Sequence, residues 1–146
     1  LRRRLKRLAA ICRRVVAMLK TTLPIQSKKL DSENNLKIIK EDITVDIDTS
    51  IFAEQRWETN FPANATRETL FAYIERIDKE KLIDTAHILT NLKALFCFLE
   101  ADAISDFKSF CQLFDLADEE YLKQLIDKIK YVFNIVLNSS AAKSKN

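Results

Sequence analysis

The sequence predicts an all-α protein, in which an antiparallel bundle of four to five helices follows a basic amphipathic N-terminal helix and a polar linker. The 146 residues include no Gly and two Pro, and Gly is the residue that hairpin turns and phosphate-binding loops most need. Apolar residues recur at spacings of three and four over most of the chain after residue 49, which indicates amphipathic helices. Connectors of a few residues between these predicted helices favour antiparallel neighbours.

Residues 1–22 are predicted to form one basic amphipathic helix, which ends before Pro24 because Pro disfavours helical geometry in the residue before it. The helix has an apolar docking face, in which residues recur at spacings of four and three. That face consists of Leu1, Leu5, Leu8, Cys12, Val15 and Leu19. The basic residues fall on the opposite arc, with Arg4 at its edge, and they are Arg2, Arg3, Arg4, Lys6, Arg7, Arg13 and Arg14.

Residues 23–48 are predicted to be a linker or extended segment, because Ser, Asn, Asp and Lys are frequent there. A short helical turn is expected around residues 35–40. Residues 43–48 alternate between apolar and polar side chains, which is typical of a strand. A single strand would have no partner in a helical chain. We therefore expect it to lie on the helices or to add to a sheet of a partner.

Residues 49–138 are predicted to form the bundle, and residues 139–146 a flexible tail. The apolar spacing predicts helices over residues 50–59, 66–77, 79–100 and 103–114, and a last one from Asp115 or Asp118 to Asn138. The helix over 79–100 is expected to bury Leu82, Ala86, Leu89, Leu92, Phe96 and Leu99. The last helix is expected to bury Tyr121, Leu122, Leu125, Ile129, Val132, Phe133 and Val136.

Charge divides the chain into two parts. Residues 1–30 contain ten Lys or Arg and no acid, whereas the remainder has 14 basic against 21 acidic residues, so +10 and −7 give the net +3. Clustered Arg favours phosphate or carboxylate partners, because its planar guanidinium forms paired hydrogen bonds. No aromatic residue precedes Phe52. Any contact of the basic segment with nucleic acid would therefore involve the backbone rather than base stacking.

Several interpretations of the basic segment stay open. It could pack on its own bundle, bind the phosphate backbone of RNA or another polyanion, or dock in an acidic groove of a protein partner. It also resembles a mitochondrial targeting segment, and peripheral membrane contact is a further alternative. No transmembrane span is predicted. Since the chain does not begin with Met, we expect it to be processed, trimmed or part of a longer one.

No catalytic, cofactor-binding or metal-binding motif is predicted. His87 is the single His and is expected to be an ordinary surface residue, while Cys97 and Cys111 lie in apolar stripes where a thiol is inert. Three Cys without metal-ligand spacing favour a reducing, intracellular compartment. Trp57 is expected either to anchor an interface or to pack over the end of the bundle.

These observations predict a non-enzymatic interaction or assembly subunit within a larger complex. Its basic amphipathic segment is expected to dock on the acidic surface of a protein partner. The alternative is a protein associated with RNA or ribonucleoprotein that binds the phosphate backbone through the same arginines.

Overall fold

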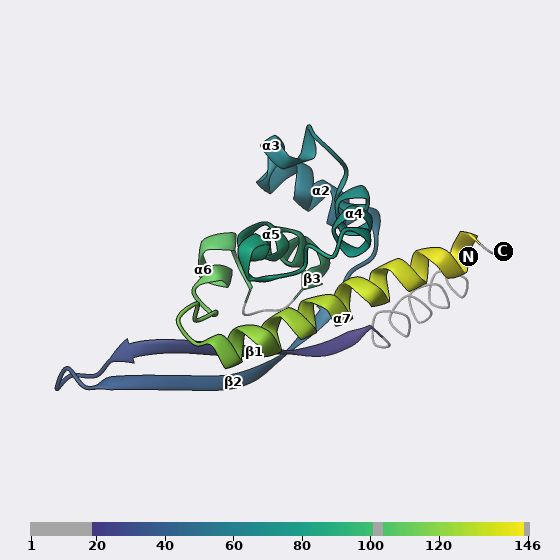
Figure 1. Ribbon diagram of the computed structural model, residues 1–146. Coiled ribbons are helices and arrows are strands. Elements are labelled where there is room, and N and C mark those ends of the chain that lie inside the picture. The colour runs from purple at the N-terminus through teal and green to yellow at the C-terminus, as the bar shows by residue number, and fades with distance from the viewer. Residues whose placement is uncertain (1–18, 101–103, 145–146) are drawn as a thin grey trace, which may run out of the picture.

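The computed structural model describes residues 19–100 and 104–144 (Figure 1). A long antiparallel hairpin comes first, and helices with one short strand follow it. In chain order the elements are β1 (Lys20–Leu30), β2 (Leu36–Ile47), α2 (Ile51–Asn60), α3 (Pro62–Ala65), α4 (Leu70–Lys79), the 3-10 turn η1 (Thr85–His87), α5 (Ile88–Phe98), β3 (Leu99–Glu100), α6 (Phe107–Cys111) and α7 (Glu119–Ser144).

The all-α prediction is wrong. The described residues form a mixed α/β fold with six α-helices and a three-stranded antiparallel sheet in the order β1-β2-β3. Residues 20–22, which were predicted to end the basic helix, begin β1, and residues 35–40 lie in the turn and β2 instead of a helical turn. The strand predicted over residues 43–48 is present as part of β2. Its partners are β1 and β3 of this chain, so the expectation that it lacks one is also wrong.

The hairpin turn forms without Gly because Asn34 adopts the left-handed conformation, with φ of 63°. Asn tolerates this region better than other non-Gly residues. Asp31 closes the turn, since its carboxylate accepts from the backbone N–H groups of Glu33 and Asn35 at 2.9 and 2.8 Å. Its own N–H donates to the carbonyl of Asn35 at 2.9 Å. The absence of Gly therefore did not exclude a hairpin.

We expect Asn34→Ala to lower the free energy of unfolding by about 1 kcal/mol, because a Cβ-bearing residue without a short polar side chain is strained at positive φ. Asn34→Gly should leave stability unchanged or raise it slightly, since Gly adopts this conformation without strain. Urea titration monitored by the fluorescence of Trp57 measures both variants. If Asn34→Ala and Asn34→Gly had equal free energies of unfolding, the backbone strain at residue 34 would be negligible.

The helical predictions hold where a local cap and the apolar spacing agree. Ser50 caps α2, because its side-chain oxygen accepts from the N–H of Phe52 at 3.3 Å. Helix α7 follows Asp118, whose carboxylate accepts from the N–H of Tyr121 at 3.1 Å, and it continues to Ser144, into the predicted tail. All seven residues predicted to form its core face are buried.

The predicted helix over residues 79–100 is wrong. Lys81 adopts a left-handed conformation, with φ of 56°, and the N–H of Leu82 bonds to the carbonyl of Ile77, so α4 ends in a Schellman-type cap with Lys in place of Gly. The next helix, α5, begins at Ile88, and Leu92, Phe96 and Leu99 are buried as predicted. Ala86 and Leu89, both predicted to be buried, are exposed.

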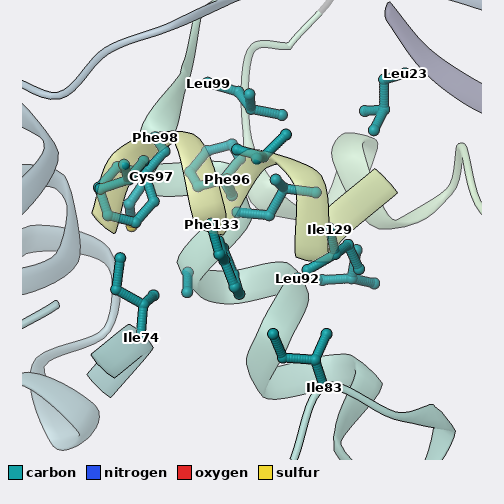
Figure 2. Close-up of a cluster of buried hydrophobic side chains, with 14 of the residues drawn as sticks. Leu23, Ile74, Ile83, Leu92, Phe96, Cys97, Phe98, Leu99, Ile129 and Phe133 are labelled. Carbon is teal, nitrogen blue, oxygen red and sulfur yellow. The ribbon is translucent and has the colours of Figure 1, made fainter. Parts of the chain in front are cut away.

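The core joins the base of the hairpin to the helices. Figure 2 shows Leu23 of β1, Ile74 of α4, Leu92 of α5 and Phe133 of α7 in one buried cluster. The rings of Phe133 and Phe98 meet edge to face, with centroids 6.3 Å apart. Because apolar residues of the hairpin extend the helical core, β1 and β2 are anchored at their base and not at their turn.

Candidate functional site

Most of the predicted docking residues lie outside the described residues. These are the whole basic set, namely Arg2, Arg3, Arg4, Lys6, Arg7, Arg13 and Arg14, and the apolar positions Leu1, Leu5, Leu8, Cys12 and Val15. Leu19 is described. It is partly buried against the core, and its carbonyl accepts from the N–H of Ile47 at 2.9 Å. Leu19 therefore belongs to the base of the sheet.

Trp57 packs inside the molecule. Its side chain is 1 % exposed, and its indole N–H donates to the carbonyl of Glu68 at 3.1 Å. Its ring lies 5.8 Å from that of Phe61 and 5.5 Å from that of Tyr73. Trp57 contributes area to the core and presents almost none to a partner.

The single His, His87, is bound by Asp84, the residue that caps the 3-10 turn η1. The carboxylate of Asp84 accepts from the backbone N–H of His87 at 3.0 Å and lies 2.7 Å from its ring Nδ1. The hydrogen bond to the His87 side chain holds the pKa of Asp84 below its usual value. This geometry starts the 3-10 turn before α5.

The two thiols among the described residues are poor nucleophiles. Burial raises the pKa of Cys97 to about 12 and also raises that of Cys111. A thiol at such a pKa is almost wholly protonated near neutrality. Within residues 19–100 and 104–144, no group of three or more His, Cys, Asp or Glu is arranged to hold a metal ion.

The feature that sequence reasoning missed is the outer part of the hairpin, residues 26–40, which we call the arm. Figure 1 shows it extending past α6 and the start of α7, so that its turn lies beyond the helices. Three large apolar side chains are exposed near the turn: Leu30 (66 %), Leu36 (62 %) and Ile38 (50 %). Leu30 pairs with Leu36, and Lys28 with Ile38. Since side chains alternate between faces, all three lie on one face, which we call the tip face.

The opposite face of the arm carries two lysines. Lys29 and Lys37 are direct cross-strand partners, and both are exposed. Like charges placed directly opposite each other destabilise a sheet. Neither lysine forms a salt bridge with any residue of the described part of the chain. An anionic partner would relieve this repulsion, so the arm combines an apolar face with a basic one.

The base of the arm is held by polar contacts to the segment before α7. The buried side-chain amide of Gln26 donates to Asp115 at 3.1 Å and to Asp118 at 3.0 Å, and its backbone N–H donates to Leu113. Lys28 forms a salt bridge with Asp115 at 3.2 Å, and the hydroxyl of Tyr121 donates to the carbonyl of Pro24 at 2.8 Å. These contacts fix the direction in which the arm leaves the molecule.

The same contacts keep two carboxylates ionised. The hydrogen bond from Gln26 is the main reason that the pKa of Asp118 lies below its usual value. The pKa of Asp115 is lowered mainly by the backbone N–H of Ala117, and then by Gln26 and Lys28. Both groups therefore remain negatively charged beside the arm.

A hollow of about 280 Å³ lies where the base of the arm meets the start of α7. We call it the acidic hollow, because four carboxylates and one lysine line it. The charged residues are Lys40, Glu41, Asp42, Asp118 and Glu120, and the others are Pro24, Ile25, Gln26, Tyr121 and Gln124. Its volume is slightly below the range of about 300–1,000 Å³ typical of small-molecule sites. It can instead accept a few side chains of a partner.

Two further hollows are smaller. One of about 200 Å³ lies between α2 and α7, and includes Ile51, Phe71 and Val136. The other, of about 230 Å³, lies beside His87 and Arg76. Arg76 is already bound to Glu68, with its guanidinium 2.6 Å from the carboxylate, so its charge is compensated. Neither hollow combines apolar and uncompensated charged groups as the arm does.

In the described part of the chain, the helices are too short or too polar for one of them to cross a membrane. Comparison with known proteins finds no match: no family model fits the chain, and no curated protein or solved structure is significantly similar to it.

Proposed function

We propose that this protein is a non-enzymatic interaction and assembly subunit that docks on an acidic, partly apolar protein surface. Two parts of the chain make the contact, namely the basic segment at the N-terminus and the arm. The observation that carries the proposal is the tip face, where Leu30, Leu36 and Ile38 are exposed at the end of a projecting hairpin. Contiguous exposed apolar side chains of this kind commonly mark interaction sites.

The partner's chemistry follows from the two faces of the arm. Leu30, Leu36 and Ile38 favour apolar contact, while Lys29 and Lys37 favour carboxylates. The basic residues of the N-terminal segment carry the same preference, because residues 1–22 include no acid. The small volume of the hollows and the raised thiol pKa values also support a binding role over catalysis.

Co-purification of the full chain from its native cells tests the proposal, with variants matched for charge. We expect the pair Leu30→Asp and Ile38→Asp to lose the partner that the wild type retains, because two carboxylates on the tip face oppose an acidic surface. The pair Ile51→Asp and Leu89→Asp is the matched control, since Ile51 and Leu89 are exposed on α2 and α5. If the tip variant retains the same partner in the same amount, the arm is not the contact site.

The second candidate is binding of the phosphate backbone of RNA. Six of the nine Arg lie within residues 2–14, and Lys29 and Lys37 add positive charge. Titration with polyuridylate at about 50 mM salt tests it, because electrostatic affinity is strongest at low ionic strength. Binding that weakens steeply with salt and disappears when residues 1–18 are deleted would favour this candidate. The absence of binding at low salt would exclude it.

A further inference from the structure

We propose that the acidic surface recognised by the arm is the acidic hollow of a second copy of this chain, so that two copies exchange their arms in a closed dimer. This inference rests on the proposed function, because it names the partner of the same arm. Three properties of the arm support it: its length, the distribution of charge along it and its open edge.

The tip cannot enter the hollow of its own chain. The ladder between β1 and β2 is continuous from Lys20 to Leu30, with no bulge that would bend the strands back. Leu30 lies four residues beyond Gln26, which lines the hollow, and this spacing places the tip about 13 Å away along an extended strand. A hairpin tip that contacts the hollow must therefore come from another molecule.

Charge is distributed unevenly along the arm. Lys29 and Lys37 lie near the turn, whereas Glu41 and Asp42 lie at the base, where Asp118 and Glu120 of the other wall join them. The turn itself adds two acids, Asp31 and Glu33, so the basic character belongs to the arm as a whole, whose residues 26–40 hold four lysines against these two acids. When two arms lie antiparallel, the net-basic arm of each copy therefore lies beside the acidic base of the other.

The apolar groups complement each other in the same way. The tip face offers Leu30, Leu36 and Ile38, and the wall of the hollow includes the rings of Pro24 and Tyr121. Leu116 is exposed in the turn between Asp115 and Asp118. The contact would thus remove apolar surface from water on the side of the tip face. On the opposite face, Lys29 and Lys37 share the side of Glu41, so opposite charges pair there.

The outer edge of β2 is open along the arm. Strand β3 pairs only with Asp46 and Ile47, so the edge from Leu36 to Val45 has no strand partner among residues 19–100 and 104–144. Natural proteins usually cover, shorten or pair such edges. An antiparallel second arm lies beside this edge and shields it. One two-fold axis then creates both tip contacts, which closes the assembly at two copies.

The test reverses the charges of the tip in one variant and those of the hollow in another, both in the full chain. The tip variant carries Lys29→Glu and Lys37→Glu, and the hollow variant carries Glu41→Lys and Asp42→Lys, because Glu41 shares the face of the two lysines. Lys28, Gln26 and Asp118 are left intact because they hold the arm in place. Light scattering after size-exclusion chromatography is expected to give twice the 16.9 kDa chain mass for the wild type. Each variant alone should dissociate, with a dissociation constant raised about tenfold or more.

An equal mixture of the two variants should restore the dimer, because each contact then pairs opposite charges again. Matched controls change the same charges on other exposed positions, with Lys123→Glu and Lys130→Glu, or Glu58→Lys and Glu75→Lys, and they should dimerise like the wild type. Circular dichroism and the fluorescence of Trp57 verify folding of every variant.

Two outcomes would overturn the inference. A wild-type chain that stays monomeric at about 100 μM, a concentration that reveals even weak specific contacts, has no such dimer. A wild type that dimerises while the mixture fails to recover means that copies meet through another surface. Neither result decides the proposed function, which has a separate test. That test is whether the variant with Leu30→Asp and Ile38→Asp loses a partner protein other than this chain. Both proposals would be overturned if the wild type is monomeric and the variant with Leu30→Asp and Ile38→Asp still retains the partner.

Discussion

Phe133→Ala is expected to lower the free energy of unfolding by about 3–5 kcal/mol, the usual effect of truncating a buried Phe. Phe133 is fully buried in α7, and its ring meets that of Phe98 edge to face. Removal of the ring loses its apolar burial and leaves a cavity between α7 and α5. Since domains of this size are stable by only about 5–15 kcal/mol, a large share of the stability would be lost.

Tyr131→Ala on the same helix is the matched control, because Tyr131 is 52 % exposed. It should change stability by less than about 1 kcal/mol, as expected for a surface position. Denaturant unfolding followed by the fluorescence of buried Trp57 compares the two variants. If Phe133→Ala and Tyr131→Ala had similar small effects, α7 would not pack on the core through this face.

Gln26→Glu is expected to weaken the junction between the arm and α7 strongly at pH 7. The side-chain amide of Gln26 donates to both Asp115 and Asp118, so the substitution removes two donors and places a third carboxylate between them. The loss of buried hydrogen bonds alone costs about 1–3 kcal/mol, and repulsion among the carboxylates adds to it.

The effect depends on pH, and its sign follows from the direction of each pKa shift. The carboxyl group introduced at position 26 would be buried beside two negative charges, which raises its pKa in the folded state. Its destabilising effect is therefore complete above the raised folded pKa, shrinks as the pH falls below that value and the folded-state group becomes a donor, and is gone below the unfolded value near 4. The wild type behaves in the opposite direction, because the lowered pKa values of Asp115 and Asp118 contribute stability that is lost in acid.

Thermal unfolding of the wild type and of Gln26→Glu between about pH 4 and pH 8 measures this difference, and that range spans the ordinary pKa of Glu and the raised value. Gln26→Met is the control, because it removes the donors without adding a charge. We expect the gap between Gln26→Glu and Gln26→Met to be largest at pH 8 and to close in acid. A gap that stays constant with pH would mean that the introduced carboxyl group is solvated and that the junction is open.

The arm shows why the fold class was mispredicted. Residues 25–30 and 36–47 flank the polar sequence Asp-Ser-Glu-Asn-Asn, and two β-compatible runs around a short polar turn are a hairpin signal. The missing Gly outweighed that signal, although Asn34 adopts the required backbone conformation. Lys81 fulfils the corresponding role at the end of α4 and interrupts a stripe that appeared continuous in the sequence.

The candidate site was beyond sequence analysis for a different reason. The exposed fractions of Leu30, Leu36 and Ile38 depend on where the hairpin leaves the core, and identical alternation in a covered strand would have buried them. The distant residues Gln26 and Asp118 form one side of the hollow only because α7 begins beside β1. No spacing in the sequence connects residues that lie so far apart.

The sequence by itself determined the features that depend on neighbouring residues. It determined the start of α2 at Ser50 and the buried face of α7, since caps and helical periodicity act within a few residues. It also determined the separation of the basic N-terminal segment from the acidic remainder. Only the tertiary structure decided that residues 20–47 pair as a hairpin, that Trp57 is in the core, and that an apolar tip and an acidic hollow lie at opposite ends of one arm. The physical reason is that strand pairing and burial are long-range: their free energy depends on which distant residues meet, which a local pattern does not record.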